Sequence, residues 1–217
     1  MILGDDARVA LYYAPASDDP LAQAAATWYA AHPAVTEDAR HYGFHATLKP
    51  PMRLRPGVTW QDVLAAAEAI AAAVPRFPLP PLMVADILGF LALRETSPCP
   101  PLQAFADACI AGADHLRAPP DAAELARRRH AGLSAAARAN LLRWGYPYAF
   151  ATWFFHMTLT RRLDAMEAAT LQPAAAAHFA AALAEPRAVA ALSLFVQPAA
   201  GEPFRAVERV PLADPAD

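Results

Sequence analysis

Apolar residues along the chain follow two spacings, and each spacing predicts its own kind of element. Val63, Leu64, Ala67 and Ile70 recur at three- and four-residue intervals, which places them on one face of an α-helix. Short apolar runs bounded by Pro, Gly or Asp instead favour β-strands. We predict helices at about 19–31, 59–74, 101–116, 121–144 and 173–183, and strands at about 8–13, 43–49, 82–86, 89–94, 151–160, 188–196 and 204–210.

Capping and turn residues define several of these ends. Asp18-Asp19-Pro20 supplies an N-cap followed by proline in the first turn of a helix. Thr59 is the predicted N-cap of the next helix, which ends at Pro75. Pro50-Pro51 is predicted to stop the second strand, because proline donates no hydrogen bond to a β-ladder.

The order of elements predicts two related halves within one domain, residues 1–217. Strand, helix, strand and hairpin precede the central helices, and strand, helix and hairpin follow them. The halves span about 1–98 and 145–217, with a helical connection at about 99–144. Short hairpins and helical connections predict an α+β fold rather than a parallel doubly wound sheet.

Composition and charge limit the kinds of partner. The 22 prolines and 8 glycines indicate rigid loops between Ala-rich helices. A net charge of −3 and a pI near 6.1 argue against the broad basic surface that binds long nucleic acids, so any phosphate site must be local. The composition leaves the oligomeric state open.

Targeting, membrane and metal signals are weak throughout. Apolar runs stay shorter than the roughly 18 to 20 residues of a membrane span, and the start at Met1–Asp6 lacks a basic stretch followed by an apolar one. We therefore expect a cytoplasmic protein without a membrane partner. Cys99 and Cys109 are expected to be ordinary small side chains rather than a disulfide. No Cys/His spacing typical of zinc occurs, so we expect neither a metal nor a cofactor.

One motif occurs twice. Segments 43–49 and 154–160 each contain an aromatic residue followed by His, one residue, Thr and Leu. Side chains two residues apart in a strand point to the same face, which pairs His45 with Thr47 and His156 with Thr158. A single copy carries little weight. Two copies, 111 residues apart and each in the same place of a repeated half, predict one shared site.

These motifs resemble those of the 2H phosphoesterase superfamily, which is named for two His-x-Thr/Ser motifs on the central strands of its lobes. The resemblance covers most of the chain and implies a two-lobed, pseudo-symmetric α+β fold, with antiparallel sheets flanked by helices around a central cleft. It implies catalytic roles for His45 and His156 and phosphate binding by Thr47 and Thr158. More narrowly, a branch encoded beside phosphonate-utilisation genes is similar in segments 41–51, 89–93 and 155–160.

The chemistry of a phosphate ester needs little beyond these side chains. Imidazole titrates near neutrality, so one histidine can accept a proton while the other donates one to the leaving oxygen. Threonine hydroxyls can bind the nonbridging oxygens without Mg²⁺. We therefore expect a metal-independent phosphoric diester hydrolase acting on a small cyclic phosphodiester; the narrower resemblance implies a ribose cyclic phosphate linked to phosphonate metabolism. The motifs do not distinguish acid from base.

Two other functions remain open. An RNA-end 2',3'-cyclic phosphodiesterase or 2'-5' ligase should show a broader basic surface than this acidic chain suggests. A catalytically silent nucleotide-binding module would need the threonines but not two proton-transferring histidines.

Further candidates lie around the motif. Lys49 and Thr160 follow the threonines by two residues and should share their face, so each is either a substrate contact or a structural residue. Arg161, Arg162 and Tyr13 are weaker candidates for a phosphate contact or the rim of the site. For another group of charged or titratable residues we expect solvent-exposed, loop or packing roles. They are Arg94, His32, His41, His115, His178 and the stretch Arg127-Arg128-Arg129-His130.

Overall fold

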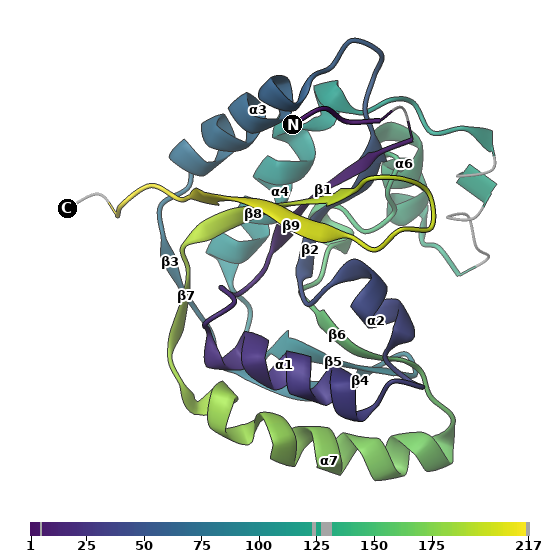
Figure 1. Ribbon diagram of the computed structural model, residues 1–217, viewed down its shortest axis with the longest axis vertical. Helices are drawn as coiled ribbons and strands as arrows, with labels where there is room; N and C mark the ends of the chain where they lie inside the picture. Colours follow the sequence, from purple (N-terminus) through teal and green to yellow (C-terminus); the bar gives the residue numbers. More distant parts are fainter. Residues whose placement is uncertain (5, 123–124, 127–131, 216–217) are drawn as a thin grey trace.

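The computed structural model describes residues 1–4, 6–122, 125–126 and 132–215 (Figure 1). Its main sheet has seven strands in the order β4-β5-β6-β2-β1-β8-β9, and β3 pairs with β7 in a small second sheet. All pairings between these named strands are antiparallel. The strands are β1 (Arg8–Tyr13), β2 (Ala46–Arg53), β3 (Phe77–Leu79), β4 (Leu82–Ile87), β5 (Phe90–Glu95), β6 (Met157–Arg162), β7 (Arg187–Val189), β8 (Ala191–Gln197) and β9 (Arg205–Pro211).

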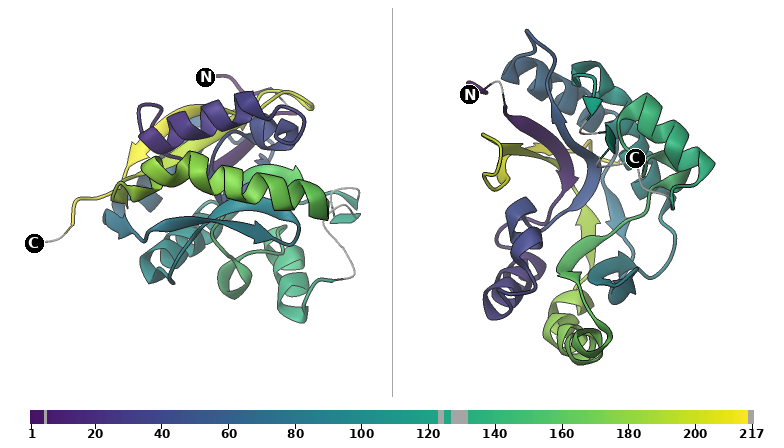
Figure 2. Two further views of the ribbon diagram at one scale, coloured as in Figure 1. Left: turned by 90° about the horizontal axis from the view of Figure 1, so that it is seen from below. Right: turned by 90° about the vertical axis from the view of Figure 1, so that its right-hand side faces the viewer.

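The helices pack against this sheet in two groups. Helices α1 and α7 contact each other and lie against strands β4, β5 and β6, whereas α3 and α4 lie against β2, β8 and β9 (Figures 1 and 2). The described helices are α1 (Pro20–Ala31), α2 (Glu37–Tyr42), α3 (Trp60–Ala72), α4 (Pro100–Gly112), α6 (Ala135–Trp144) and α7 (Ala165–Ala184), with short 3₁₀ turns η1 (Asp114–Leu116) and η2 (Phe150–Thr152). None of these helices is both long enough and apolar enough to cross a membrane.

The main sheet is nearly divided in the middle. Strands β2, β1, β8 and β9 form one lobe and β4, β5 and β6 form the other, and within the sheet β2 and β6 pair through Ala46 and Met157. The mixed α+β architecture with antiparallel sheets and flanking helices is the predicted one. Each lobe combines strands from both halves of the sequence, because hairpin β8–β9 adds to β1 and hairpin β4–β5 adds to β6.

Local capping signals placed the starts of helices α1 and α3 correctly. Asp19 Oδ1 accepts a hydrogen bond from Leu21 N at 2.7 Å, and Thr59 forms a reciprocal capping box with Asp62. Helix α7 begins at Ala165, eight residues before the predicted start at Pro173. The capping box at its N-cap, Asp164, with Glu167 starts the helix there, and the proline lies inside it.

Several predicted boundaries were wrong. Strand β2 continues through Pro50-Pro51 to Arg53, because both prolines fall within a register shift of its pairing with β1. Strand β6 begins at Met157 rather than at 151, after the 3₁₀ turn η2. Helix α2 and strand β3 were not predicted. Within the predicted helix 121–144 the structure describes α6, and the stretch Arg127–His130 lies outside the described residues.

Candidate active site

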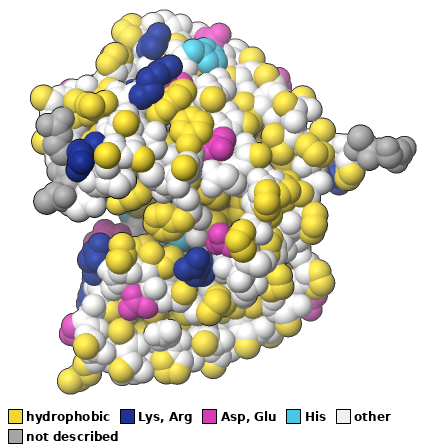
Figure 3. Space-filling model, turned by 180° about the vertical axis from the view of Figure 1, so that it is seen from behind, with side chains coloured by type: hydrophobic (Ala, Val, Ile, Leu, Met, Phe, Trp, Pro, Cys, Tyr) yellow, Lys and Arg dark blue, Asp and Glu magenta, His cyan; other side chains and the backbone are white. Residues whose placement is uncertain are grey.

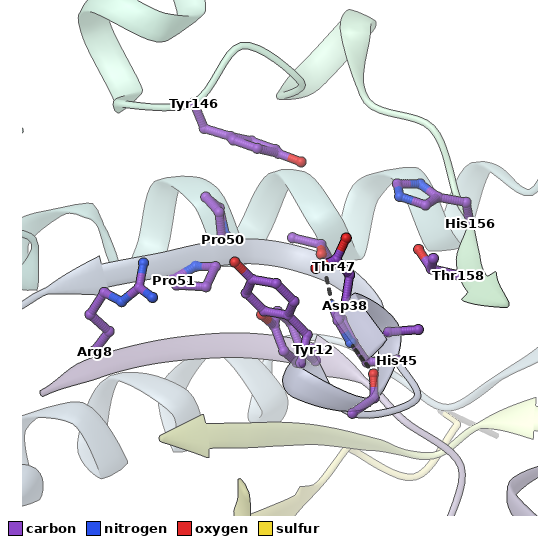
Figure 4. Close-up of a pocket in the computed structure, with 13 residues that line it drawn as sticks. Arg8, Tyr12, Asp38, His45, Thr47, Pro50, Pro51, Tyr146, His156 and Thr158 are labelled. Atoms are coloured by element: carbon purple, nitrogen blue, oxygen red, sulfur yellow. Dashed lines mark hydrogen bonds between the residues drawn. The ribbon is translucent and has the colours of Figure 1, made fainter. Parts of the chain in front are cut away.

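A cavity of about 430 Å³ lies between the lobes and contains both repeated motifs. Figure 3 shows the hollow that separates the lobes on that face of the molecule, and Figure 4 shows the cavity from within. His45, Thr47, His156 and Thr158 all line it. The other lining residues are Arg8, Tyr12, Asp38, Ala39, Tyr42, Gly43, Pro50, Pro51 and Tyr146.

The single pairing between β2 and β6 brings the two motifs together. Ala46 pairs with Met157 in antiparallel register, and each of these residues directly follows a motif histidine. Continued by one residue in either direction, this register places Thr47 across from His156 and Thr158 across from His45. The motif pairs therefore come from opposite sides of the cavity, as Figure 4 shows.

His45 is fixed through three contacts. Its Nδ1 lies 2.8 Å from Gly43 O, and its Nε2 lies 3.2 Å from Thr47 Oγ1. A carbonyl oxygen only accepts, so the Nδ1 of His45 carries the proton, and the Nε2 of the neutral ring accepts from the threonine hydroxyl. The ring of Tyr12 stacks on the imidazole, with centroids 3.6 Å apart and planes 16° apart.

Gly43 has a backbone requirement of its own. It ends helix α2 with φ of 78°, in the region that favours glycine. A Cβ at this position would lie 3.0 Å from a ring carbon of Phe195. The glycine therefore allows the chain to turn from α2 into β2 and to present its carbonyl to His45.

The surroundings of His45 favour its neutral form. Burial lowers its pKa to about 4, with a smaller contribution from His156, against the opposing effect of the hydrogen bond to Gly43. At neutral pH this imidazole is therefore unprotonated and able to accept a proton at Nε2.

His156 is held in the same way from the other lobe. Its Nδ1 lies 3.3 Å from Phe154 O, again two residues earlier in the chain. Phe154 stacks on the imidazole with centroids 4.8 Å apart, and Phe90 meets it edge to face at 5.9 Å. Burial lowers the pKa of His156, and the hydrogen bond to Phe154 opposes that shift. Both Nδ1 atoms are thus bound to the backbone, and the Nε2 of His45 is held by the Thr47 hydroxyl, which also lines the cavity.

The main chain of each threonine is held by an aromatic donor. Trp153 Nε1 donates to Thr47 O at 2.8 Å, and the Tyr29 hydroxyl donates to Thr158 O at 2.6 Å. Trp28 Nε1 donates to Leu159 O at 3.2 Å, next to the second threonine. These bonds fix the two backbone segments from which the threonine hydroxyls project.

Lys49 does not line the cavity, although alternation predicted that it would share the face of Thr47. Between Thr47 and Lys49 the pairing with β1 advances by only one residue, from Tyr12 to Leu11. This bulge turns Lys49 to the other side of the sheet. There the ammonium group is buried and donates to Ile110 O at 2.9 Å and to Asp114 Oδ1 at 3.4 Å.

The other weaker candidates also lie away from the cavity lining. Thr160 is buried, and its hydroxyl accepts from Leu91 N at 3.0 Å. Arg161 is paired with Glu167 at 2.8 Å, and Arg162 donates to Leu88 O. The side chain of Tyr13 is buried beside Phe155, and Arg94 is exposed on β5.

Arg8, Tyr12, Asp38 and Tyr146 line the cavity but are not among the predicted site residues. Tyr12, rather than its neighbour Tyr13, faces the cavity, and Arg8 lies on the same face of β1. The alternation of side chains along β1 predicts that these two residues share one face of the strand. It does not predict that this face lies beside the two histidines. Asp38 and Tyr146 come from α2 and from the segment after α6, so only the tertiary fold brings them here.

Four other described histidines lie outside the cavity lining, and His115 among them is exposed in η1. His41 lies in helix α2 and contacts the buried Gln197. His32 follows α1 beside Trp28, and His178 contacts Ala24 O from α7. In the described part of the chain, no cluster of three or more His, Cys, Asp or Glu side chains could hold a metal ion.

Comparisons with known proteins identify the family to which the sequence of this chain belongs. Residues 47–205 match the family described as "Protein of unknown function (DUF1045)". A protein of Janthinobacterium sp. (strain Marseille) named "Ribose 1,5-bisphosphate phosphokinase PhnN" is 40% identical over 95% of this chain and 51% of its own length. One of the same name from Laribacter hongkongensis (strain HLHK9) is 39% identical over 82% of this chain and 41% of its own length. The chain thus spans about half or less of these relatives.

Solved structures share the fold. E. coli LigT, in a structure described as complexed with NADP+, aligns over 97% of this chain and 100% of its own, with a TM-score of 0.51 and 16% identity. A structure titled "Crystal structure of phosphoesterase" aligns over 99% and 100%, with a TM-score of 0.50 and 17% identity. The family match spans most of the sequence and the fold is that of solved phosphoesterases, so this chain is a member of the DUF1045 family with the 2H phosphoesterase fold.

Proposed function

We propose that this protein is a metal-independent phosphoesterase that opens a small cyclic phosphodiester with His45 and His156 as its proton-transfer pair. One observation carries the proposal. Both histidines bind a backbone carbonyl through Nδ1, and both line one cavity together with Thr47 and Thr158. Fixing Nδ1 in this way orients each ring and leaves Nε2 for proton transfer.

The reaction uses the two imidazoles in opposite roles. A water oxygen bonds to phosphorus while the bond from phosphorus to one ring oxygen breaks. One histidine removes a proton from the water, and the other gives a proton to the departing ring oxygen. When substrate binds, the Thr47 hydroxyl gives up its hydrogen bond to His45 Nε2, and the hydroxyls of Thr47 and Thr158 donate to the nonbridging oxygens, where negative charge increases in the transition state.

We assign the base to His45 and the acid to His156. Both rings have lowered pKa values, and the pKa of His45, at about 4, makes it the stronger candidate for the neutral partner. Its Nε2 already accepts from Thr47, as a neutral imidazole can. A bound phosphodiester anion stabilises the imidazolium form, which favours protonation of His156 in the complex.

The proposed substrate is a ribose cyclic phosphate that also carries a second phosphate. A cavity of about 430 Å³ has the size of a small-molecule site. Opening a 1,2-cyclic phosphate of ribose 5-phosphate at its O2–P bond leaves a phosphate on O1 and gives ribose 1,5-bisphosphate. That compound appears in the name of both relatives, which links the reaction to the phosphonate context of the narrower resemblance.

Phosphorus NMR tests the proposal. Metal-free protein is incubated with ribose 1,2-cyclic phosphates with and without a 5-phosphate, with nucleoside 2',3'-cyclic phosphates and with RNA that ends in a 2',3'-cyclic phosphate. We expect the five-membered-ring signal of a small sugar phosphate to be replaced by a monoester signal, and His45→Ala and His156→Ala to slow the change about 10²- to 10⁴-fold. Consumption of the RNA ends alone would favour the RNA-end enzyme, and binding without conversion of any of these compounds would favour the silent binding module.

A further inference from the structure

Two polar side chains lie together at the part of the cavity away from His156. Arg8 and Tyr12 are four residues apart on β1, so the strand repeat places both on the same face. Both line the cavity that holds the histidines. In Figure 4 the guanidinium group of Arg8 and the hydroxyl of Tyr12 are neighbours beside Pro51, across the cavity from His156 and Thr158.

Arg8 is held in position by a buried amide. Its Nε donates to Gln197 Oε1 at 2.6 Å, and Gln197 is fully buried. The amide nitrogen of Gln197 donates to Glu202 O at 2.7 Å and to His41 Nε2 at 3.3 Å. Because a guanidinium group only donates, the amide oxygen must face Arg8, and the glutamine orientation is fixed.

The remainder of the Arg8 guanidinium is available to a ligand. The ring of Phe204 lies 5.3 Å below its central carbon and supports it by a cation–π contact. Within residues 1–4, 6–122, 125–126 and 132–215, its two terminal nitrogens have no hydrogen-bond partner and no carboxylate lies within ion-pair distance. The fork that binds a phosphate or carboxylate through two parallel hydrogen bonds is thus open.

Tyr12 provides a second donor at this part of the cavity. Its side chain is only 1% exposed, packed between His45 and Phe195, yet its hydroxyl has no hydrogen-bond partner among the described residues. Because Tyr12 lines the cavity and its hydroxyl is not among the buried polar atoms without a partner, the hydroxyl reaches the cavity, where it can donate to an acceptor group of a ligand. Burial also raises the pKa of Tyr12 well above its usual value, so the phenol stays an uncharged donor.

We propose that Arg8 and Tyr12 form a subsite for a second anionic group of the substrate, a phosphate monoester at the end of the molecule remote from the scissile phosphodiester. This inference rests on the proposed function and specifies its substrate class. The exposed carboxylate of Asp38 at the same cavity accepts hydrogen bonds, which suits a hydroxyl group between the two phosphates. The substrate class is therefore a hydroxylated molecule with two phosphates, rather than a simple cyclic diester.

The ratio of kcat/KM between two substrates tests this subsite. The pair is ribose 1,2-cyclic phosphate with and without a 5-phosphate, assayed with the wild-type chain and with Arg8→Gln, Tyr12→Phe and Arg94→Gln. Loss of a charge-assisted phosphate contact should lower the ratio about 10- to 10²-fold in Arg8→Gln, and loss of one neutral hydrogen bond about fivefold in Tyr12→Phe. The control Arg94→Gln removes an exposed arginine outside the cavity and should leave the ratio unchanged.

Equilibrium binding separates this proposal from the proposed function. Calorimetry with ribose 5-phosphate as the probe should show about 10- to 10²-fold weaker binding to Arg8→Gln, and little change in Thr158→Val. That result without turnover of any cyclic phosphate would support the subsite and overturn the proposed function. Turnover with an unchanged substrate ratio in both Arg8→Gln and Tyr12→Phe would overturn the subsite alone. Thermal unfolding of each variant verifies that it is folded.

Discussion

The ring of Tyr12 stacks on the imidazole of His45, with centroids 3.6 Å apart and planes 16° apart. This contact covers one face of the histidine, whose pKa burial lowers to about 4. The same tyrosine directs its hydroxyl toward Arg8 (Figure 4), so one side chain connects the proposed catalytic centre with the proposed second phosphate subsite.

Removing the Tyr12 ring should raise the pKa of His45. In Tyr12→Ala water reaches the imidazole, and the pKa should move from about 4 toward the usual value of about 6.5. Tyr12→Phe keeps the stacked ring and should leave that pKa low. NMR titration of the His45 ring protons measures both variants. A pKa that stays near 4 in Tyr12→Ala would show that other neighbours cause the shift.

Replacing either histidine should remove most of the activity. His45→Ala and His156→Ala should each lower kcat about 10²- to 10⁴-fold, the usual contribution of one acid–base group, while substrate binding changes less. A p-nitrophenyl phosphodiester has a leaving group that needs no proton. With that substrate the defect of His156→Ala should shrink and that of His45→Ala should persist. If the defect of His45→Ala shrinks and that of His156→Ala persists, His45 is the acid and His156 is the base.

The pH profile of kcat/KM should be bell-shaped with an acidic optimum. The base must be neutral, so the rate should fall as the pH drops through about 4, the pKa of His45. The acid must be protonated, and the pKa of His156 lies below its usual value, so the rate should fall before the pH reaches about 6.5. The two apparent values belong to the pair of interacting histidines. Initial rates between pH 3 and 9 test this, and an optimum above pH 7 would contradict it.

Lys49 should matter for structure and not for substrate. Lys49→Met keeps the aliphatic volume, and Asp114 retains Arg117 at 2.8 Å and Arg143 at 3.3 Å. We expect unchanged kcat/KM and a free energy of unfolding within about 2 kcal/mol of wild type. Asp114→Ala should cost about 3 kcal/mol, because it leaves the ammonium of Lys49 without its counter-ion. Urea unfolding measures the free energies of unfolding, and steady-state kinetics measures kcat/KM. A Lys49→Met enzyme with about 10²-fold lower kcat/KM would refute the structural role.

Activity should survive removal of metal ions. The proposed mechanism uses imidazole and hydroxyl groups alone, and within the described residues no cluster of metal-binding side chains is present. Dialysis against EDTA should leave kcat unchanged, and added Mg²⁺, Mn²⁺ or Zn²⁺ should not raise it. Loss of turnover on chelation that a divalent ion restores would instead require a metal-assisted reaction.

The two His-x-Thr motifs could be recognised from the sequence because their information is local. A period of two fixes which side chains share a face, and the repetition in two halves indicates a shared site. Capping residues such as Asp19 and Thr59 were equally local, since a cap bonds to its own helix. Predicted helix boundaries were wrong where two local signals disagreed. Pro173 is the predicted start of a helix, but that helix begins at the capping box of Asp164 and contains the proline.

Only the tertiary structure decided which other residues reach the cavity. A bulge between β1 and β2 turns Lys49 away from the face of Thr47, and bulges depend on the partner strand. The neighbours Tyr12 and Tyr13 differ in role because the sheet exposes one face to the cavity and the other to the core. The proposed subsite at Arg8 depends on Gln197, 189 residues away. The sequence by itself therefore determined the reactive groups, whereas strand pairing over long distances decided their surroundings.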